Sequence, residues 1–432
     1  MALSDKLKLK NPIAAAAYFA ISWISLAITL KLKLGSATDK LYAEDGGIYI
    51  QQAIDFPFPR DVFEPYAGYS DVTARIAANF VTLFPINLYT TVILALVSLV
   101  LALIGFIVFS SSQGEVKNPI LRVLLAIGLI LLPIGNFESI GNITNLHFYL
   151  MSGCLFLLLG KDLPNKKFFV GSIFIIISCL STPLMIYYLP IIVIQKFLHY
   201  RHKIPISFNP YQISLLIGVI LQMLFVFTLA YGDRNASSNH NLLKTIYLFM
   251  DRVIGSAIIP FWGYVSTSDS IQNTQVLIFR AGVVTFISLV SLFFFNYWYR
   301  SHSVDLVFPL SLLIGLLFYW FSIGYFFAPE PRYAIFAGYM LVCAVISTMG
   351  TVFARKGSRT AISLIITISL STWVGSFTPS ALRTFGPTVM EQITPASTKC
   401  DSQNKQVRIR LLPLNGNWEL IVSCGKLERS KT

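Results

Sequence analysis

Long apolar runs that recur along the chain constrain its fold more than any other feature. Runs of roughly 18–22 apolar residues are each long enough to cross about 30 Å of hydrocarbon as a helix. Only 12% of the 432 residues are charged, whereas water-soluble domains carry about a quarter. We therefore predict an all-α polytopic membrane protein. The first run is too long for a cleaved signal peptide, and the segment around Ser36 is a poor cleavage site.

We expect about eleven transmembrane helices. Their approximate ranges are 12–31, 87–109, 119–135, 146–160, 167–181, 183–198, 212–231, 275–297, 304–326, 333–353 and 359–376. Pro183 interrupts a long apolar stretch, so either a tight turn or a kinked helix is expected there. The chain divides into a transmembrane region, 1–376, and a short polar tail, 377–432.

Lysine and arginine are unevenly distributed between the connecting segments. "KDLPNKK" (161–167), "KFLHYRHK" (196–203) and "ARKGSR" (354–359) fall on the same side as the basic N-terminus. The positive-inside rule places this side in the cytoplasm and the C-terminal tail outside. "KLK" at 31–33 is an exception, because it follows the first span on the outer side. The rule accounts for much of the net charge of +13, and we find no nucleic-acid-binding motif.

The long polar segments all lie on the predicted outer side, where we expect the function to reside. The first of them, 34–86, contains "GGIYIQQAIDF", which predicts an amphipathic helix at the membrane surface. "DVTARIAANFVTLFP" follows and predicts a second helix, too short to span. In the tail, "VRIRLLPLNGNWELIVSC" predicts a small β-hairpin. If the tail faces an oxidising compartment, Cys400 and Cys424 are expected to form a disulfide.

The segment "LYAEDGGIYI" (41–50) places Glu44 and Asp45 beside Gly46 and Gly47. A single carboxylate at the end of a span is usually only solvated. This pair differs, because the glycines allow another backbone or a ligand to approach closely. A carboxylate near the membrane surface can act as a general base toward a hydroxyl. Adjacent helical side chains diverge by about 100°, so only one of the two is expected to face a reacting atom.

Basic and aromatic side chains on the outer side form two further sets. Arginine at the end of a span often only snorkels, but it can also hold a lipid phosphate by paired hydrogen bonds. The candidates for phosphate or donor binding are Arg75, His147, Lys244, Arg252 and Arg332. Aromatic residues there form either an interfacial belt or the lining of a sugar pocket. The candidates for lining are Tyr66, Tyr69, Trp262 and Tyr333. We find no metal-ligand spacing.

The acidic pair in the first outer loop, the amphipathic helix after it and the eleven spans resemble the GT-C superfamily of membrane glycosyltransferases. "AEDGGIYIQQA", "EPYAGYSDVTARIAANF" and the tail are similar to a poorly described bacterial branch. The resemblance implies an inverting transferase that moves a sugar from a polyprenyl-phosphate donor to a glycan, lipid or protein acceptor. It implies a bacterial inner membrane, with catalysis on the outer face and no tightly bound cofactor. Asp45 or Glu44 would be the base, and Arg75 or Arg332 would bind the lipid phosphate.

The chain departs from many superfamily members because it lacks their large soluble C-terminal domain, so the acceptor is not identified. Two other functions stay open. A polysaccharide polymerase or ligase would place key arginines in a late outer loop, and 232–274 contains Arg234 and Arg252. A flippase or transporter of lipid-linked sugars usually has paired halves with interrupted helices, a pattern that we do not find.

Overall fold

The computed structural model describes residues 12–56, 58–131, 140–161, 168–206, 208–229, 241–255, 307–326, 331–352, 386–398, 400, 405–412 and 417–428. Its fold is mostly helical, with one small sheet. The bundle contains α2 (Pro12–Leu34), α5 (Tyr89–Ser111), α6 (Pro119–Leu131), α8 (Leu146–Gly153), α9 (Leu155–Leu159), α10 (Phe168–Ser181), α11 (Tyr188–Arg201), α12 (Pro210–Leu229), α13 (Leu242–Leu248), α16 (Val307–Phe326) and α17 (Ala334–Val352).

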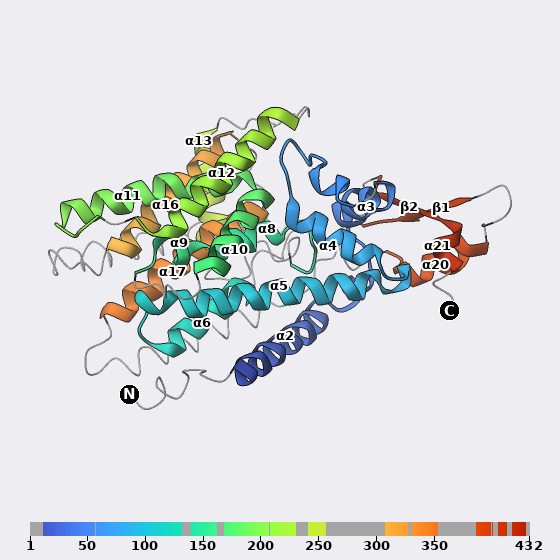
Figure 1. The fold of residues 1–432 in the computed structure, drawn as a ribbon, viewed down its shortest axis with the longest axis horizontal. Helices are drawn as coiled ribbons and strands as arrows, with labels where there is room; N and C mark the ends of the chain where they lie inside the picture. Colours follow the sequence, from blue (N-terminus) through green and yellow to red (C-terminus); the bar gives the residue numbers. More distant parts are fainter. Residues whose placement is uncertain are drawn as a thin grey trace.

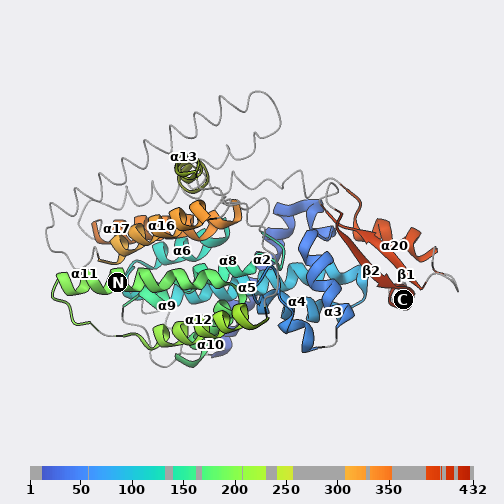
Figure 2. The same ribbon diagram turned by 90° about the horizontal axis from the view of Figure 1, so that it is seen from above.

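Elements from two distant parts of the chain gather at one end of this bundle and form what we call the cap, the described residues of 35–88 and 386–428 (Figures 1 and 2). The cap contains the π-helical segment η2 (Asp45–Ile50), α3 (Gln51–Asp55), α4 (Val72–Thr82), α20 (Val389–Thr398), β1 (Gln406–Arg410), β2 (Glu419–Ser423) and α21 (Cys424–Glu428). Short 3-10 turns connect these elements at Gly35–Asp39, Arg60–Phe63 and Ile86–Leu88. Segments from the two ends of the chain are therefore joined in one structure.

Apolar side chains cover outward faces of the bundle. α2 exposes Ile21, Ile24 and Ile28, and α12 exposes a similar row that includes Leu224 and Phe227. Such continuous apolar faces are tolerated against lipid but not against water. Four described helices are long and apolar enough to cross a membrane, or five if one bent pair counts as a span. Several apolar helices can thus span a membrane, as expected for a multi-pass protein.

The predicted number of eleven spans is not confirmed. The ranges 275–297 and 359–376 lie outside the described residues. Shorter apolar helices occupy other predicted spans, at Pro119–Leu131, Leu146–Leu159 and Ala334–Thr348. A helix rises 1.5 Å per residue, so ones of this length cross only part of the hydrocarbon layer unless the adjoining segments extend them.

Of the two conformations expected at Pro183, the structure contains a sharp turn. The helices on either side, Phe168–Ser181 and Pro183–Arg201, are bent by 115° relative to each other. Thr182 caps the start of the second helical segment, because its Oγ1 accepts a hydrogen bond from the backbone N–H of Leu184 (3.3 Å). Proline suits the first position of the new helical segment, where no N–H is required.

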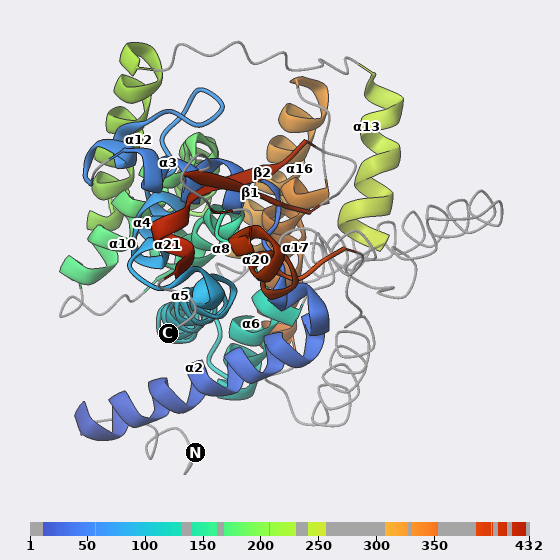
Figure 3. The same cartoon turned by 90° about the vertical axis from the view of Figure 1, so that its right-hand side faces the viewer.

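The tail forms the predicted β-hairpin and docks on the first polar segment (Figure 3). β1 and β2 are antiparallel, with Gln406 opposite Ser423. A parallel bridge joins Tyr42 to Leu412, which follows β1 in the chain. Gln51 adds a further link, because its Oε1 accepts the backbone N–H of Ile421 (2.7 Å).

The two short helices predicted in the first polar segment are present, as η2 with α3 and as α4. In the first of them, Tyr49 and Ile50 are buried within the protein, so protein covers part of the face that was expected on the membrane surface. η2 packs between α4 on one side and β2 on the other. Of the predicted apolar positions, Ile50 is buried, and Ala53 and Ile54 are half-buried against the core.

The glycines after the acidic pair make room for the hairpin. A Cβ on Gly46 would lie 2.7 Å from Leu411 Cδ1, and one on Gly47 would lie 2.9 Å from Trp418 Cε3. These distances are shorter than carbon atoms tolerate, so each glycine permits close packing against the tail. The sequence predicted that either another backbone or a ligand approaches these glycines. In the structure, the tail of the same chain approaches them.

Gly47→Val should loosen the hairpin from η2. Overpacking of this kind costs about 1–3 kcal/mol, and we expect faster hydrogen exchange in β2 together with a lower unfolding temperature in detergent. Gly425→Ala is the matched control, because nothing lies within 4 Å of its added Cβ. Unchanged exchange in Gly47→Val would contradict the proposed close packing.

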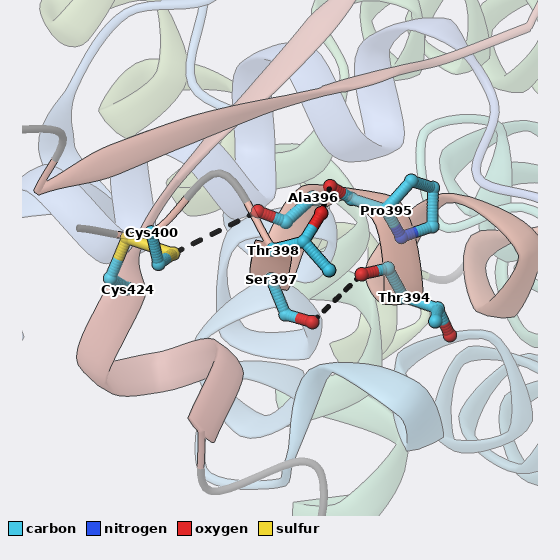
Figure 4. The surroundings of a disulfide bond; sticks show 7 residues. All are labelled: Thr394, Pro395, Ala396, Ser397, Thr398, Cys400 and Cys424. Atoms are coloured by element: carbon cyan, nitrogen blue, oxygen red, sulfur yellow. Dashed lines mark hydrogen bonds between the residues drawn. A yellow bond between two sulfur atoms is a disulfide. The ribbon is translucent and has the colours of Figure 1, made fainter.

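The predicted disulfide between Cys400 and Cys424 is present (Figure 4). It joins the segment after α20 to the start of α21, directly beyond β2. The other cysteines, Cys154, Cys179 and Cys343, are free and buried. The hairpin is consequently tied to α20 at its base as well as docked on η2.

Wild-type protein in intact cells should resist a membrane-impermeant maleimide until it is reduced. Reduction should then expose Cys400 and Cys424, while the three buried cysteines stay unlabelled. Cys400→Ser/Cys424→Ser should abolish the labelling after reduction. Labelling of the wild type without reduction would contradict the disulfide, and failure to label after reduction would contradict an external tail.

Candidate functional site

Glu44, Tyr66 and Arg332 meet at the cap end of the bundle. Glu44 Oε1 lies 3.6 Å from Arg332 Nη1, and the Tyr66 hydroxyl donates to the same oxygen at 3.5 Å. The two charged side chains keep 16% and 19% of their surface exposed. They are therefore held in place by packing but still open to a ligand.

A tight turn positions two of the predicted lining residues. The backbones of Tyr66 and Tyr69 exchange two hydrogen bonds, at 2.8 and 3.0 Å. Ala67 and Gly68 between them have positive φ values of 47° and 82°, as a type I′ turn requires. The turn sets the two tyrosine rings edge to face, with centroids 5.7 Å apart.

Aromatic rings continue from this turn toward Arg332. Tyr69 lies 6.4 Å from the His147 ring, which stacks on Phe148 at 4.2 Å. Phe148 in turn lies 5.4 Å from Tyr333. The predicted residues Tyr66, Tyr69, His147 and Tyr333 thus form one connected group, while Trp262 lies outside the described residues.

The acidic pair divides into two different environments. Asp45 is 3% exposed, and its carboxylate accepts the backbone N–H groups of Ile143 (3.1 Å) and Thr144 (3.0 Å). The Thr144 hydroxyl donates a third bond to it. Asp45 therefore fixes the segment before α8, whereas the partly exposed Glu44 faces Arg332. Only one of the pair faces the open group, as the divergence of neighbouring side chains predicted.

Asp71 is a central residue that the sequence analysis did not select. Its Oδ1 accepts the Ala74 N–H (3.3 Å) and caps α4. Its Oδ2 accepts the Tyr49 hydroxyl (2.9 Å) and lies 3.5 Å from His147 Nδ1. Burial and the Asp71 charge raise the pKa of Tyr49, which therefore stays a donor. The helix-start pattern "SDVTAR" predicts the cap, but no local pattern predicts the other two contacts.

Arg75 is turned inward rather than toward a lipid phosphate. It is buried, and its Nη1 donates to Gln52 Oε1 (2.8 Å) and to the Asp61 carbonyl (2.7 Å). The guanidinium also lies over the Tyr49 ring at 5.5 Å. Burial lowers its pKa, although the charge of Asp71 counteracts this. Its position supports a role in joining α3, α4 and the 60–64 turn, and does not support direct phosphate binding.

Lys244 and Arg252 belong to the described segment 241–255, between α12 and α16. Lys244 is an exposed residue of α13, and Arg252 belongs to the following π-helical segment, Phe249–Gly255. Burial raises the pKa of Asp251, and the adjacent Arg252 charge opposes the rise. The hydrogen bond, ion pair and ring contacts described above for the Glu44 group are made by other residues.

Within the described ranges, no group of three His, Cys, Asp or Glu side chains is arranged to hold a metal ion. Comparison of the chain with protein-family models, with curated proteins and with solved structures found no match. A functional assignment therefore depends on the residues of the site itself.

The two carboxylates should respond differently to neutralisation. Asp45→Asn replaces one buried acceptor with a donor that faces backbone N–H groups, and should lower stability by about 1–3 kcal/mol. Glu44→Gln removes a partly exposed ion pair and should change stability by less than about 1 kcal/mol. Thermal unfolding in detergent measures both. Equal losses in the two variants would contradict this division.

Proposed function

We propose that this protein is a membrane glycosyltransferase that moves a sugar from a polyprenyl phosphate to a hydroxyl acceptor at the cap end of the bundle. The observation that carries the proposal is the partly exposed Glu44 carboxylate beside the Arg332 guanidinium and a row of aromatic rings. A base, a phosphate-binding cation and aromatic surfaces for a sugar are the three components that such a transfer requires.

In the proposed reaction, Glu44 removes the proton from the acceptor hydroxyl as its oxygen attacks the anomeric carbon. The bond between that carbon and the phosphate oxygen breaks, and its electrons leave with the polyprenyl phosphate. Arg332 stabilises the charge that develops on this leaving group. A sugar phosphate already has a good leaving group, so no strong general acid is needed. Attack from the opposite face inverts the anomeric carbon.

The ion pair between Glu44 and Arg332 has a direct consequence for this mechanism. At 3.6 Å, the two side chains leave no space for a reacting centre between base and phosphate. Donor binding must therefore draw the guanidinium from Glu44 to the phosphate, whose oxygens accept paired hydrogen bonds and gain negative charge as the sugar leaves. The carboxylate is then released to accept a proton.

Tyr66 and Asp45 support Glu44 in different ways. Burial and the Glu44 charge raise the pKa of Tyr66, so its hydroxyl remains a donor that orients the carboxylate. Asp45 holds the segment that leads into α8 and thereby places His147 and Phe148 next to the site. We propose Glu44 as the base and Asp45 as a positioning residue.

The proposed orientation places the cap outside a bacterial inner membrane and the N-terminus in the cytoplasm. The basic connecting segments and the Cys400–Cys424 disulfide support it. The lipid-linked donor would enter from the membrane with its prenyl chain between helices. The acceptor is a hydroxyl of a glycan, lipid or protein.

Membranes containing the protein should transfer radiolabelled sugar from at least one member of a panel of polyprenyl-phosphate sugars. Glu44→Gln should lower transfer by about 10²–10⁴-fold, the contribution of a general base, while donor binding is kept or strengthened because Arg332 is released. Arg332→Gln should weaken donor binding. Donor retention and kcat/KM measure the two effects separately.

Arg408→Gln serves as the control, because it removes an exposed cation of the hairpin that pairs with Glu419. Its transfer should match the wild type. Full activity of folded Glu44→Gln would overturn the assignment of the base. Absence of transfer by folded wild type from every donor would favour the polymerase or transporter alternatives.

A further inference from the structure

A cavity lies at the end of the bundle opposite the cap, and the proposed transferase site does not use it. Its volume is about 370 Å³, within the range of small-molecule sites. It is formed where α9 and α11 end and α12 begins, at the left-hand end of the bundle in Figure 1.

Three basic side chains line this cavity, at Lys161, Lys196 and His199, and none of its described lining residues carries a carboxylate. The neighbouring Glu115 accepts the backbone N–H of Lys161 (3.1 Å). His199 is only 9% exposed, and its Nε2 has no hydrogen-bond partner within the described part of the chain. A buried donor or acceptor without a partner is costly, so a ligand that reaches it would be stabilised.

Three amide side chains donate hydrogen bonds to backbone carbonyls around the cavity. The carbonyls of Leu157, Leu158 and Leu159 at the end of α9 lack helical partners. They accept hydrogen bonds from Asn209 (2.8 Å), Gln212 (2.8 Å) and Gln195 (2.7 Å), respectively. Because these carbonyls are already bonded, Lys161, Lys196 and His199 supply the charge among the described residues that a ligand meets.

Apolar side chains form the rest of the wall and its surroundings. Phe168, Ile204 and Phe208 line the cavity, and Phe208 is 73% exposed. Lys196 Nζ lies 5.6 Å from the Phe208 ring centroid, so a cation and an exposed apolar surface are adjacent. Phe197, on the same helix as Lys196, is also exposed. This combination suits an amphiphile whose charged group enters the cavity while its chains stay in the membrane.

We propose that this cavity binds the phosphate headgroup of an anionic membrane lipid. Lys161 and Lys196 contact the phosphate oxygens, His199 lies beneath them, and the acyl chains lie along the exposed aromatic side chains. Basic pockets between membrane helices recognise anionic headgroups in this manner. The positive-inside rule explains why lysines occur at this end, but not why they converge with a buried histidine on one cavity.

Native mass spectrometry of the purified protein with phosphatidylglycerol or phosphatidylcholine tests the proposal. The wild type should retain phosphatidylglycerol in preference. Lys161→Gln/Lys196→Gln should weaken that binding by at least about tenfold, the effect of losing a charge-assisted hydrogen bond. The control Lys117→Gln/Lys203→Gln removes two exposed cations outside the cavity lining and should stay within about twofold of the wild type.

Phe208→Asp provides a second variant that does not disturb the core, because the side chain is exposed. It places a carboxylate beside Lys196 and should also reduce phosphatidylglycerol binding. A parallel titration with inorganic phosphate separates a soluble ligand from a lipid. Equal retention of phosphatidylglycerol by the wild type and the cavity variants would overturn the proposal. Binding of inorganic phosphate without any preference for phosphatidylglycerol would overturn the lipid assignment.

Discussion

The buried carboxylate of Asp45 is the interaction on which the cap depends. A charge removed from water must be compensated by hydrogen bonds, and three donors at Ile143 and Thr144 supply them. These bonds thereby fix the segment that leads into α8 to the start of η2. His147 and Phe148, in the first turn of α8, reach the Glu44 group because this anchor is in place.

Several polar contacts join the segments of the cap to one another. Asp71 caps α4 and accepts the Tyr49 hydroxyl, and Arg75 joins α4 to Gln52 and to the Asp61 carbonyl. Together they place η2 between α4 and the tail hairpin. Glu44, at the edge of this assembly, is thus a partly exposed carboxylate on a rigid support. A general base needs such a support, because it must be held in a defined position relative to the substrate hydroxyl.

The two ends of the bundle carry different chemistry. The cap end combines a carboxylate, an arginine and aromatic rings, which suits proton removal beside a phosphate leaving group. The opposite end combines lysines, a buried histidine and exposed apolar side chains, which suits stable retention of an anionic headgroup. A lipid held there would contact α11 and α12, and it would leave the cap free for the lipid-linked donor.

The amino-acid sequence by itself determined the membrane character, the approximate positions of the long apolar helices that the structure describes, the hairpin and the pairing of Cys400 with Cys424. These features follow from hydropathy, turn residues and cysteine context, which are properties of neighbouring residues. Only the tertiary structure decided that Asp45 is buried while Glu44 is open, that Arg75 points inward, and that Asp71 is central. The Asp45–Thr144 bond joins residues 99 positions apart, and no local pattern encodes such a pairing. A side chain's exposure depends on which distant segment covers it, and that is settled only when the chain packs.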